Sequence, residues 1–597
     1  MNFKSRYKDK SPQETIAKIS GIIEMLGLDL HEDWLEPVEG IYSVHLRING
    51  TNIAVNGKGS ERNFALASGY GELMERLQNM LPFRINDNFI WFSHDIANSI
   101  SPDEKLTDSF GETPEELKWY NQVTKNFPDA GELQEVFKSH WNDLSIRNEQ
   151  GKIINLEYCS YKDPSKRMVL PLGLLNIYYG SNGMCAGNTN EEALVQGLSE
   201  ILERYATYEI LYKKLTPPDI TNHICERYPY LHTLISRIEE GDYEVLVKDL
   251  SLGKNVPVVA VILFDKEKLK YFVSTASHPC LDIATERGIT ECLQGRTLEL
   301  FHGMTKISDS VENIDETANA VNIFIDGEGV YPYQLFMSKP SYGANLDMYD
   351  RQYNDNLELL SSLVECIDDL GFEIYVRDEN FLGVPAYHII VPGLSELLDV
   401  TNMEVLESHK EYQRFSRNSK KINSLDHSEL DELMNYITEN IGESSKCLSS
   451  TWYLKLAEES VFGKITRDLL LMLYFIKTKE YTKAYSHSKE FIRFLELEGV
   501  SIDFIRHYEV ISTILQLKVE GLAEEDILSV LSNFVSLEDV TSCLVDLENT
   551  DSVFEDIPVL NCPNCDDCVE RCNCAFVNEK LLFTKLMKFK TSRELVG

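Results

Sequence analysis

Long apolar runs are missing from the sequence. None of its hydrophobic segments is long enough to cross a bilayer, and Met1–Lys10 contains no apolar stretch of the kind that secretion signals carry. We therefore expect a cytoplasmic protein without export or a membrane anchor. The chain has 597 residues, of which 43% are hydrophobic, so three or four domains with sizeable cores are expected.

Positive charge is also scarce. The sequence has 57 lysines and arginines against 96 aspartates and glutamates, which gives a formal net charge of −39. Such a chain lacks the basic surface that binds the phosphate backbone of DNA or RNA, so we expect no nucleic-acid partner. The charge would attract a basic protein partner, and it also has the simpler explanation of solubility and low nonspecific binding.

Paired cysteines are absent from most of the chain. Eight of the thirteen cysteines are scattered singly, which indicates reduced thiols rather than a disulfide framework. The other five form the run Cys562, Cys565, Cys568, Cys572 and Cys574. Spacing of this density is typical of thiolate metal ligation, and zinc is the first choice. An iron-sulfur centre is the second choice, although Asn573 stands where a ferredoxin run has proline, and a redox-active or metal-free tail is the third.

The most informative stretch that is present is a glycine-rich turn followed by a helix, over Asn182–Tyr208. Thr189 and Glu192 have the spacing of a capping box, so the helix is predicted to begin near Asn190. One face of this helix carries polar side chains at helical spacing. These are Glu192, Gln196, Glu200, Glu203 and Arg204.

The same order of turn and polar helix recurs. The run Asn56–Gly59, which contains Lys58, precedes a helical segment whose polar residues are Ser68, Glu72, Glu75 and Arg76. A partial third copy follows Pro279 and carries Glu291, Gln294 and Arg296. A single pair of glutamates at this spacing is usually a solvated helix face, but its repetition behind such turns favours a shared site.

Charge indicates what such a site would bind. Carboxylates that are brought together raise one another's pKa values unless a cation neutralises them, and Mg²⁺ prefers carboxylate oxygen. Arginines and helix N-termini behind glycine turns favour phosphate. The pattern therefore predicts a magnesium-nucleotide site.

The remaining pattern predicts an α+β fold with mixed or antiparallel sheets, because strand pairs are joined by links too short for crossover helices. We expect a nucleotide-binding domain over residues 1–402, with a peripheral helical insertion at about 95–150. Residues 403–555 have helical periods and predict a tetratricopeptide-like domain. Residues 556–597 form the cysteine-cluster tail.

At the glutamate motifs the chain resembles the YcaO family, in which ATP and Mg²⁺ are bound by glutamates on helices. The resemblance is carried by Asn56–Arg76, Ser181–Arg204 and Glu291–Arg296. It implies that Mg²⁺ is held among Glu72, Glu75, Glu200 and Glu203, with catalytic roles for Glu75, Glu203 and Arg204. The residues that it places around ATP are Lys58, Ser68, Arg76, Cys185, Asn188, Glu192, Arg204, Glu291, Gln294 and Arg296. Cys185 stands where the family usually has serine.

The resemblance further implies that ATP activates a peptide amide by phosphorylating its oxygen. Order and length are similar to those of the members that assist the methylthiotransferase RimO in modifying a small-subunit ribosomal protein, so RimO and that protein are the expected partners. An azoline-forming or thioamide-forming enzyme is the alternative, although the end Thr591–Gly597 lacks the proline-rich terminus of azoline-forming enzymes. A non-enzymatic scaffold is the third reading. The sequence does not determine whether the chain catalyses a reaction beyond ATP hydrolysis. It also does not determine the oligomeric state, for which a homodimer is one alternative.

Overall fold

The computed structural model describes residues 8–84, 101, 103–125, 130–148, 150–241, 243–298, 301–311, 316–400, 402–419, 421–441, 465–548, 554, 568, 571 and 574–594. The chain divides into two compact units. Unit 1 consists of Met1–Leu406 and Lys580–Gly597, and unit 2 of Glu407–Glu579. Unit 1 is therefore built from both ends of the chain.

The described residues of unit 1 form three sheets. The first has the order β1-β2-β3, from β1 (Leu30–Val38), β2 (Ile41–Ile48) and β3 (Ala54–Gly59). The second has the order β11-β10-β9-β8, from β8 (Glu244–Asp249), β9 (Val258–Asp265), β10 (Lys270–Ser277) and β11 (Thr305–Lys306). The third has the order β4-β5-β12-β13-β7, from β4 (Glu104–Thr107), β5 (Ile153–Ser160), β12 (Tyr375–Asp378), β13 (Ala386–Ile390) and β7 (Met184–Ala186), with β6 (Arg167–Pro171) also paired to β5. The pairings between described strands are antiparallel, which confirms the predicted α+β class.

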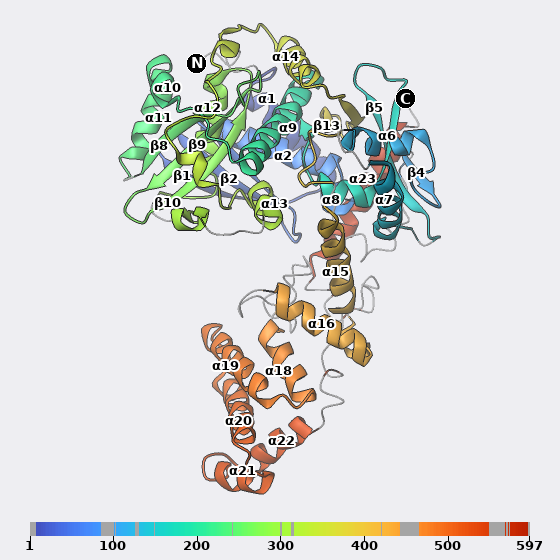
Figure 1. Ribbon diagram of the computed structural model, residues 1–597, viewed down its shortest axis with the longest axis vertical. Helices are drawn as coiled ribbons and strands as arrows, with labels where there is room; N and C mark the ends of the chain where they lie inside the picture. Colours follow the sequence, from blue (N-terminus) through green and yellow to red (C-terminus); the bar gives the residue numbers. More distant parts are fainter. Residues whose placement is uncertain are drawn as a thin grey trace. The chain divides into compact units, whose positions relative to one another are not determined.

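The helices of unit 1 connect and cover these sheets (Figure 1). They are α1 (Pro12–Leu26), α2 (Arg62–Gln78), α3 (Leu81–Arg84), α6 (Pro114–Val123), α7 (Ala130–Leu144), α8 (Leu172–Tyr178), α9 (Asn190–Lys213), α10 (Thr221–Arg227), α11 (Pro229–Glu239), α12 (Leu281–Cys292), α13 (Glu316–Asp326) and α14 (Asn356–Asp369). The chain returns to unit 1 in α23 (Phe576–Glu594), and short 3-10 helices occur at Ile307–Val311, Tyr333–Phe336 and Asp347–Asp350.

Three of these helices each pack against two sheets. Helix α2 contacts β2 and β3 of the first sheet and β7 and β13 of the third. Helix α9 contacts β7 and β13 and also β9 and β10 of the second sheet, while α12 contacts β9, β10 and β3. The three helices thus alternate with the three sheets around a common centre, and these are the helices on which the sequence places its polar pairs.

Two glycines let the chain approach these helices closely. A Cβ atom at Gly57 would lie 2.1 Å from the carbonyl oxygen of Ala65 in α2. A Cβ atom at Gly187 would lie 2.5 Å from the backbone nitrogen of Ala193 in α9. Real Cβ atoms do not approach this closely, so the glycines before α2 and α9 are needed for packing.

The predicted peripheral helical insertion at 95–150 requires correction. Strand β4 lies within this segment and pairs with β5, so the segment extends the third sheet. Trp119 and Trp141 are buried with ring centroids 5.1 Å apart, and Phe110, Tyr120 and Phe137 pack around Trp141. Burial of this aromatic cluster makes the described part of the segment integral to unit 1.

Unit 2 is helical throughout its described part, as predicted. Its elements are the end of α15 (Met403–Ser419), a 3-10 turn at Ile422–Ser424, α16 (His427–Asn440), α18 (Arg467–Lys477), α19 (Tyr481–Leu497), α20 (Ile502–Val519), α21 (Glu524–Leu531) and α22 (Leu537–Glu548). Phe491, Phe494 and Leu495 form a core against which Ile505 and Tyr508 pack. The tetratricopeptide-like character stays a prediction.

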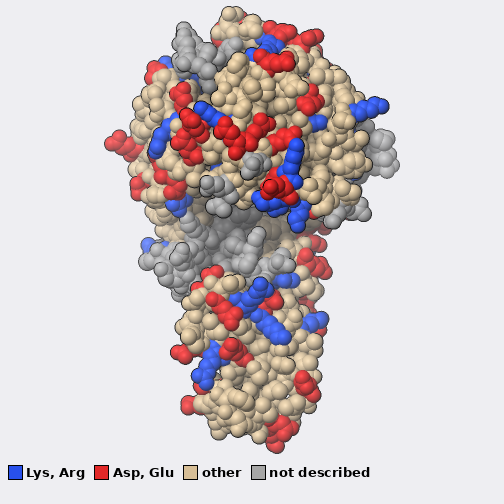
Figure 2. Space-filling model, turned by 90° about the vertical axis from the view of Figure 1, so that its left-hand side faces the viewer, with Lys and Arg blue, Asp and Glu red and all other residues tan. Residues whose placement is uncertain are grey.

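Within the described residues no helix is long and apolar enough to span a membrane. On the face drawn in Figure 2, acidic and basic side chains of the described residues are interspersed. This distribution agrees with a chain that is acidic overall but has both charges on its surface.

Candidate functional site

A cavity of about 920 Å³ opens in unit 1 where α2, α9 and α12 converge. Its walls also include β10, the glycine turn before α9 and the start of α1. Small-molecule sites have volumes of about 300–1,000 Å³, so the cavity is at the upper end of that range. It has room for a large ligand or for two ligands together.

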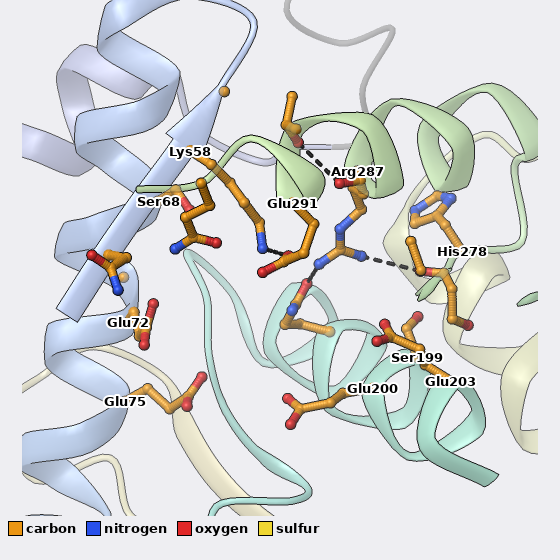
Figure 3. A pocket seen from close by; sticks show the side chains of 18 of the residues that line it. Lys58, Ser68, Glu72, Glu75, Ser199, Glu200, Glu203, His278, Arg287 and Glu291 are labelled. Atoms are coloured by element: carbon orange, nitrogen blue, oxygen red, sulfur yellow. Dashed lines mark hydrogen bonds and ion pairs between the residues drawn. The ribbon is translucent and has the colours of Figure 1, made fainter. Parts of the chain in front are cut away.

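Four glutamates from two helices line this cavity. Glu72 and Glu75 come from α2, and Glu200 and Glu203 come from α9, so the two pairs project into one space (Figure 3). Burial raises the pKa of Glu75 well above its usual range; Arg76 opposes this rise, and Glu200 and Glu72 add to it. Burial likewise raises the pKa of Glu203 to about 7, although Arg204 opposes the rise. Burial is the largest cause of both shifts, so the nearby arginines do not fully offset the cost of charging Glu75 and Glu203.

Arginines on the same helices orient part of the carboxylate set. Arg76 lies 3.3 Å from Glu72 Oε1 and 3.4 Å from Glu75 Oε1. Arg204 lies 3.2 Å from Glu200 Oε1 and also donates to the carbonyl oxygen of Phe324 at 2.7 Å. The i, i+4 spacing that places each arginine beside a glutamate is a direct product of the helical period.

Helix α12 adds a third charged wall. Arg287 donates hydrogen bonds to Gln196 Oε1 on α9 and, at 3.2 Å, to the carbonyl oxygen of Ser277. Lys58 forms an ion pair with Glu291, and burial together with nearby Arg287 lowers the pKa of Lys58 to about 8. Arg287 was not predicted as a site residue, although its position one turn before Glu291 on the same helix could have indicated it.

Further lining residues were not predicted from the sequence. Ser199 and Ser277 line the cavity and are 1% exposed, and their hydroxyls have no hydrogen-bond partner among the described residues. Thr275 on β10 donates to Glu203 Oε1 at 3.1 Å. Burial and the nearby Arg287 hold the pKa of His278 well below its usual range, so its imidazole is neutral at physiological pH. Ser199, Ser277 and Thr275 belong to no repeated or periodic motif, so the sequence gives no signal that they line a site.

Almost every residue predicted for the magnesium-nucleotide site lies at the cavity. Those that line it are Lys58, Ser68, Glu72, Glu75, Arg76, Asn188, Glu192, Glu200, Glu203, Arg204, Glu291, Gln294 and Arg296. The three segments that carry the repeated motif are far apart in the sequence, and they line the same cavity, as the repetition predicts. Their individual roles stay predictions.

Two residues of this set, Glu192 and Arg296, form hydrogen bonds with other parts of the protein at the cavity wall. Glu192 accepts hydrogen bonds from Lys8 at 3.1 Å, from the backbone N–H of Asp9 at 3.0 Å and from Asn188. Arg296 donates to the carbonyl oxygens of His302 and Gln294, both at 3.2 Å, and stacks on the ring of Phe272. These contacts give both side chains a role in shaping the cavity walls.

Cys185 is the exception. Neighbouring Ala186 lines the cavity, whereas Cys185 on β7 is fully buried, with its Sγ 3.6 Å from the carbonyl oxygen of Tyr387. A Cβ atom at Gly197 would lie 2.9 Å from this sulfur, so Cys185 sits beneath α9. Successive strand residues point to opposite sides, which is why the thiol faces the core. The predicted contact between Cys185 and a nucleotide does not agree with this position.

The residues present fit a metal that is shared with a second ligand. Among the described residues, no three His, Cys, Asp or Glu side chains cluster closely enough to hold a metal ion by themselves. Mg²⁺ is usually held by one or two carboxylates together with phosphate oxygens and water. Glutamates on two helices, with arginine, lysine and unpaired hydroxyls nearby, match that donor set.

The predicted zinc ligands Cys562, Cys565 and Cys572 lie outside the described residues. Cys568 and Cys574 are described and half-buried. Zinc binding by the tail therefore stays a prediction.

The antiparallel α+β fold and the carboxylate-lined cavity can be compared with known families. The family model described as YcaO cyclodehydratase, ATP- and Mg²⁺-binding, matches residues 56–395. The chain belongs to the YcaO family, which confirms the resemblance found at the glutamate motifs.

Two bacterial relatives are similar to this chain over 65% of its length. One is an uncharacterized protein of Haemophilus influenzae, 32% identical over 407 residues. The other is the ribosomal protein S12 methylthiotransferase accessory factor YcaO of Escherichia coli, 31% identical over 404 residues. The chain spans 66% of the length of each relative, slightly less than two thirds.

The solved structures to which the chain is similar are more distant. A heterocyclase in complex with substrate and cofactor has 19% identity and a TM-score of 0.44, covering 65% of this chain and 53% of that chain. The YcaO protein from Methanopyrus kandleri, bound with AMPPCP and Mg²⁺, has 16% identity and a TM-score of 0.39, covering 65% of this chain and 92% of that chain.

Proposed function

We propose that the chain binds ATP with Mg²⁺ in the cavity between α2, α9 and α12 and uses it to activate a peptide amide. The observation that carries the proposal is that the pairs Glu72/Glu75 and Glu200/Glu203 face one cavity with raised pKa values at Glu75 and Glu203. A divalent cation would supply the missing neutralisation. Membership of a family described as ATP- and Mg²⁺-binding supports the same ligand.

In this proposal the acidic residues bind the metal ion and the basic residues bind the phosphates. The four glutamates would hold Mg²⁺, while Arg76 and Arg204 orient Glu72, Glu75 and Glu200. Arg287 and Lys58 bring positive charge to the opposite wall, where phosphate oxygens would be bound. The hydroxyls of Ser199 and Ser277 are further donors. When bound, MgATP supplies the phosphoryl group that converts an amide oxygen into a leaving group.

The biological role that we propose is that of an accessory factor for RimO in the β-methylthiolation of a small-subunit ribosomal protein in the cytoplasm. Similarity to the Escherichia coli accessory factor supports it most strongly. The net charge of −39 gives weaker support, because ribosomal proteins are basic. The alternatives are an azoline-forming or thioamide-forming enzyme and a non-enzymatic scaffold. The nearly complete set of charged residues around the cavity disfavours the scaffold.

Nucleotide binding tests the biochemical half of the proposal. The purified chain should bind ATP much more tightly with Mg²⁺ than with a chelator and should hydrolyse it only when Mg²⁺ is present. Calorimetric titration and phosphate release measure the two effects. Equal binding with and without Mg²⁺ would remove the carboxylate helices from the mechanism.

A deletion strain tests the biological half. Mass spectrometry of its ribosomal proteins should show reduced methylthiolation, which wild-type protein restores and Glu203→Gln does not. An unchanged level of modification in the deletion strain would refute the role. Full restoration by Glu203→Gln would show that the role does not need ATP turnover.

A further inference from the structure

One loop is hydrogen-bonded both to helix α2 and to the turn that precedes helix α9. It connects β12 to β13 and covers residues 379–385. Gln78, the last residue of α2, is fully buried and donates through its amide to the carbonyl oxygen of Val384 at 2.9 Å. Its amide oxygen accepts from the backbone N–H of Leu382 at 2.8 Å. The loop is thereby fixed to α2 three residues after Glu75.

The same loop also reaches the turn that begins α9. The backbone N–H of Gly187 donates to the carbonyl oxygen of Pro385 at 3.0 Å. Val384 itself lines the cavity. Because Gln78 and Gly187 are bonded to loop residues that lie next to one another, the position of this loop fixes how far the start of α9 lies from the end of α2.

The first residue of the loop is held by the far end of the chain. Glu379 is 2% exposed, and its carboxylate lies 2.6 Å from Nζ of Lys590 on α23. Lys590 is 5% exposed and also lies 3.3 Å from Asp103, while Arg377 pairs with both acids. Buried charges are costly unless they are paired, so this cluster strongly favours one position of the loop.

Helix α23 also contacts other parts of unit 1 directly. Lys585 donates to the carbonyl oxygen of Leu26 at 2.9 Å, and the ring of Phe583 lies 5.6 Å from that of Phe83. These contacts hold α23 in place, and they thereby fix the position of Lys590.

We propose that Lys590 is a positioning residue of the site, which acts through Glu379 and the 379–385 loop to set the spacing between the glutamates of α2 and those of α9. The proposal rests on the function proposed above, because the spacing matters only if the glutamates share a ligand. Lys590 is not among the residues that line the cavity, so it would act on the site only through other residues.

Hydrogen exchange of the full-length chain without ligand tests the positioning directly. The variants are Lys590→Met, Lys590→Arg and the control Lys588→Met, which changes an exposed lysine on the same helix. Lys590→Met should accelerate exchange several-fold at the end of α2, in the 379–385 loop and in the turn before α9. Lys590→Arg should stay close to wild type, and Lys588→Met should match it. Acceleration confined to α23 would overturn the proposal.

Mg²⁺ titration gives a second readout. In Lys590→Met the Mg²⁺ concentration for half-maximal ATP binding should rise about tenfold, which is the order of effect seen when a group that orients metal ligands is removed. ATP binding without Mg²⁺ should change much less. An unchanged Mg²⁺ requirement in a folded variant would contradict the positioning role. If wild-type protein binds no nucleotide, the proposed function fails, and the exchange measurement still decides whether Lys590 positions the loop.

Loss of one partner from a buried ion pair can unfold a protein. The double variant Glu379→Gln/Lys590→Met leaves no unpaired charge at this contact and keeps the test decisive. In a folded double variant the loop and the two helix ends should still exchange faster than in wild type. Wild-type exchange rates there would show that packing alone holds the loop.

Discussion

Thr275 and Glu203 join the second sheet to helix α9 at the cavity, with Thr275 Oγ1 donating to Glu203 Oε1 at 3.1 Å. Thr207 supports the same contact, because its hydroxyl lies 2.9 Å from the carbonyl oxygen of Glu203 and 3.3 Å from Thr275 Oγ1. The carboxylate of Glu203 is therefore held in one orientation before any ligand binds.

Two substitutions at this contact should have graded effects. Glu203→Gln removes an anionic ligand but keeps its shape, and we expect Mg²⁺-dependent ATP turnover to fall about a thousandfold or more. Thr275→Val removes only the orienting donor, so turnover should fall about tenfold, with a raised Mg²⁺ requirement. Steady-state phosphate release at varied Mg²⁺ measures both. Glu61→Gln, an exposed change just before α2, is the control and should leave turnover unchanged.

Arg287 lines the cavity, links α12 to α9 through Gln196 and was not among the residues predicted from the sequence. We expect Arg287→Met to raise the KM for ATP roughly ten- to a hundredfold, since a hydrogen bond to a charged group contributes about 1.5–3 kcal/mol. Arg287→Lys should have an intermediate effect, because lysine keeps the charge but cannot bond Gln196 and Ser277 together. Steady-state kinetics check this, and the control is Arg237→Met, a change at a half-buried arginine that does not line the cavity. Equal KM values for wild type and Arg287→Met would exclude contact with phosphate.

Helical period is the reason that much of the site could be predicted. Glu72, Glu75 and Arg76, like Glu200, Glu203 and Arg204, face one side of a helix whatever the tertiary fold, and their repetition indicated a common site. The strand pairs and the turn at Asn49–Gly50 are equally local signals.

Features that depend on distant contacts could not be predicted. The bond from Gln78 to Val384 spans 306 residues and leaves no periodic trace. Cys185 was assigned to the cavity by family position, whereas strand alternation turns it to the core. In α23 apolar and basic residues alternate around the helix, so nothing in the sequence marks Lys590 as buried.

The cysteine tail should bind about one zinc ion per chain, because the run from Cys562 to Cys574 has the density of thiolate metal sites. Metal analysis of purified protein should find this zinc, and its loss is expected when Cys562 and Cys565 are changed to serine. ATP turnover should be retained, since the described cysteines of the run, Cys568 and Cys574, do not line the cavity. If the purified protein contained iron and had a visible charge-transfer absorbance, the zinc assignment would be wrong and the cluster would be an iron-sulfur centre.

Unit 1 should also contain a titrating carboxylate outside the cavity. Glu396 accepts hydrogen bonds from Tyr179, from Trp119 Nε1 at 3.2 Å and from the backbone N–H of Gly393 at 2.8 Å. Burial raises the pKa of Glu396 from its ordinary 4.5 to about 7, against the opposing effect of the Tyr179 hydrogen bond. The folded state therefore binds a proton at this site more tightly than the unfolded state.

The sign of the resulting pH dependence follows from linkage. Stabilisation by protonated Glu396 is fully present below about pH 4.5 and is lost as the pH rises through about 7. Chemical unfolding at pH 5.0 and pH 8.5 should show that wild type loses about 2 kcal/mol more than Glu396→Gln, which stays neutral. Tyr179→Phe removes a donor to the carboxylate, so the loss should move to higher pH. If wild type and Glu396→Gln have parallel pH profiles, the carboxylate is already ionised in the folded protein at pH 5.0.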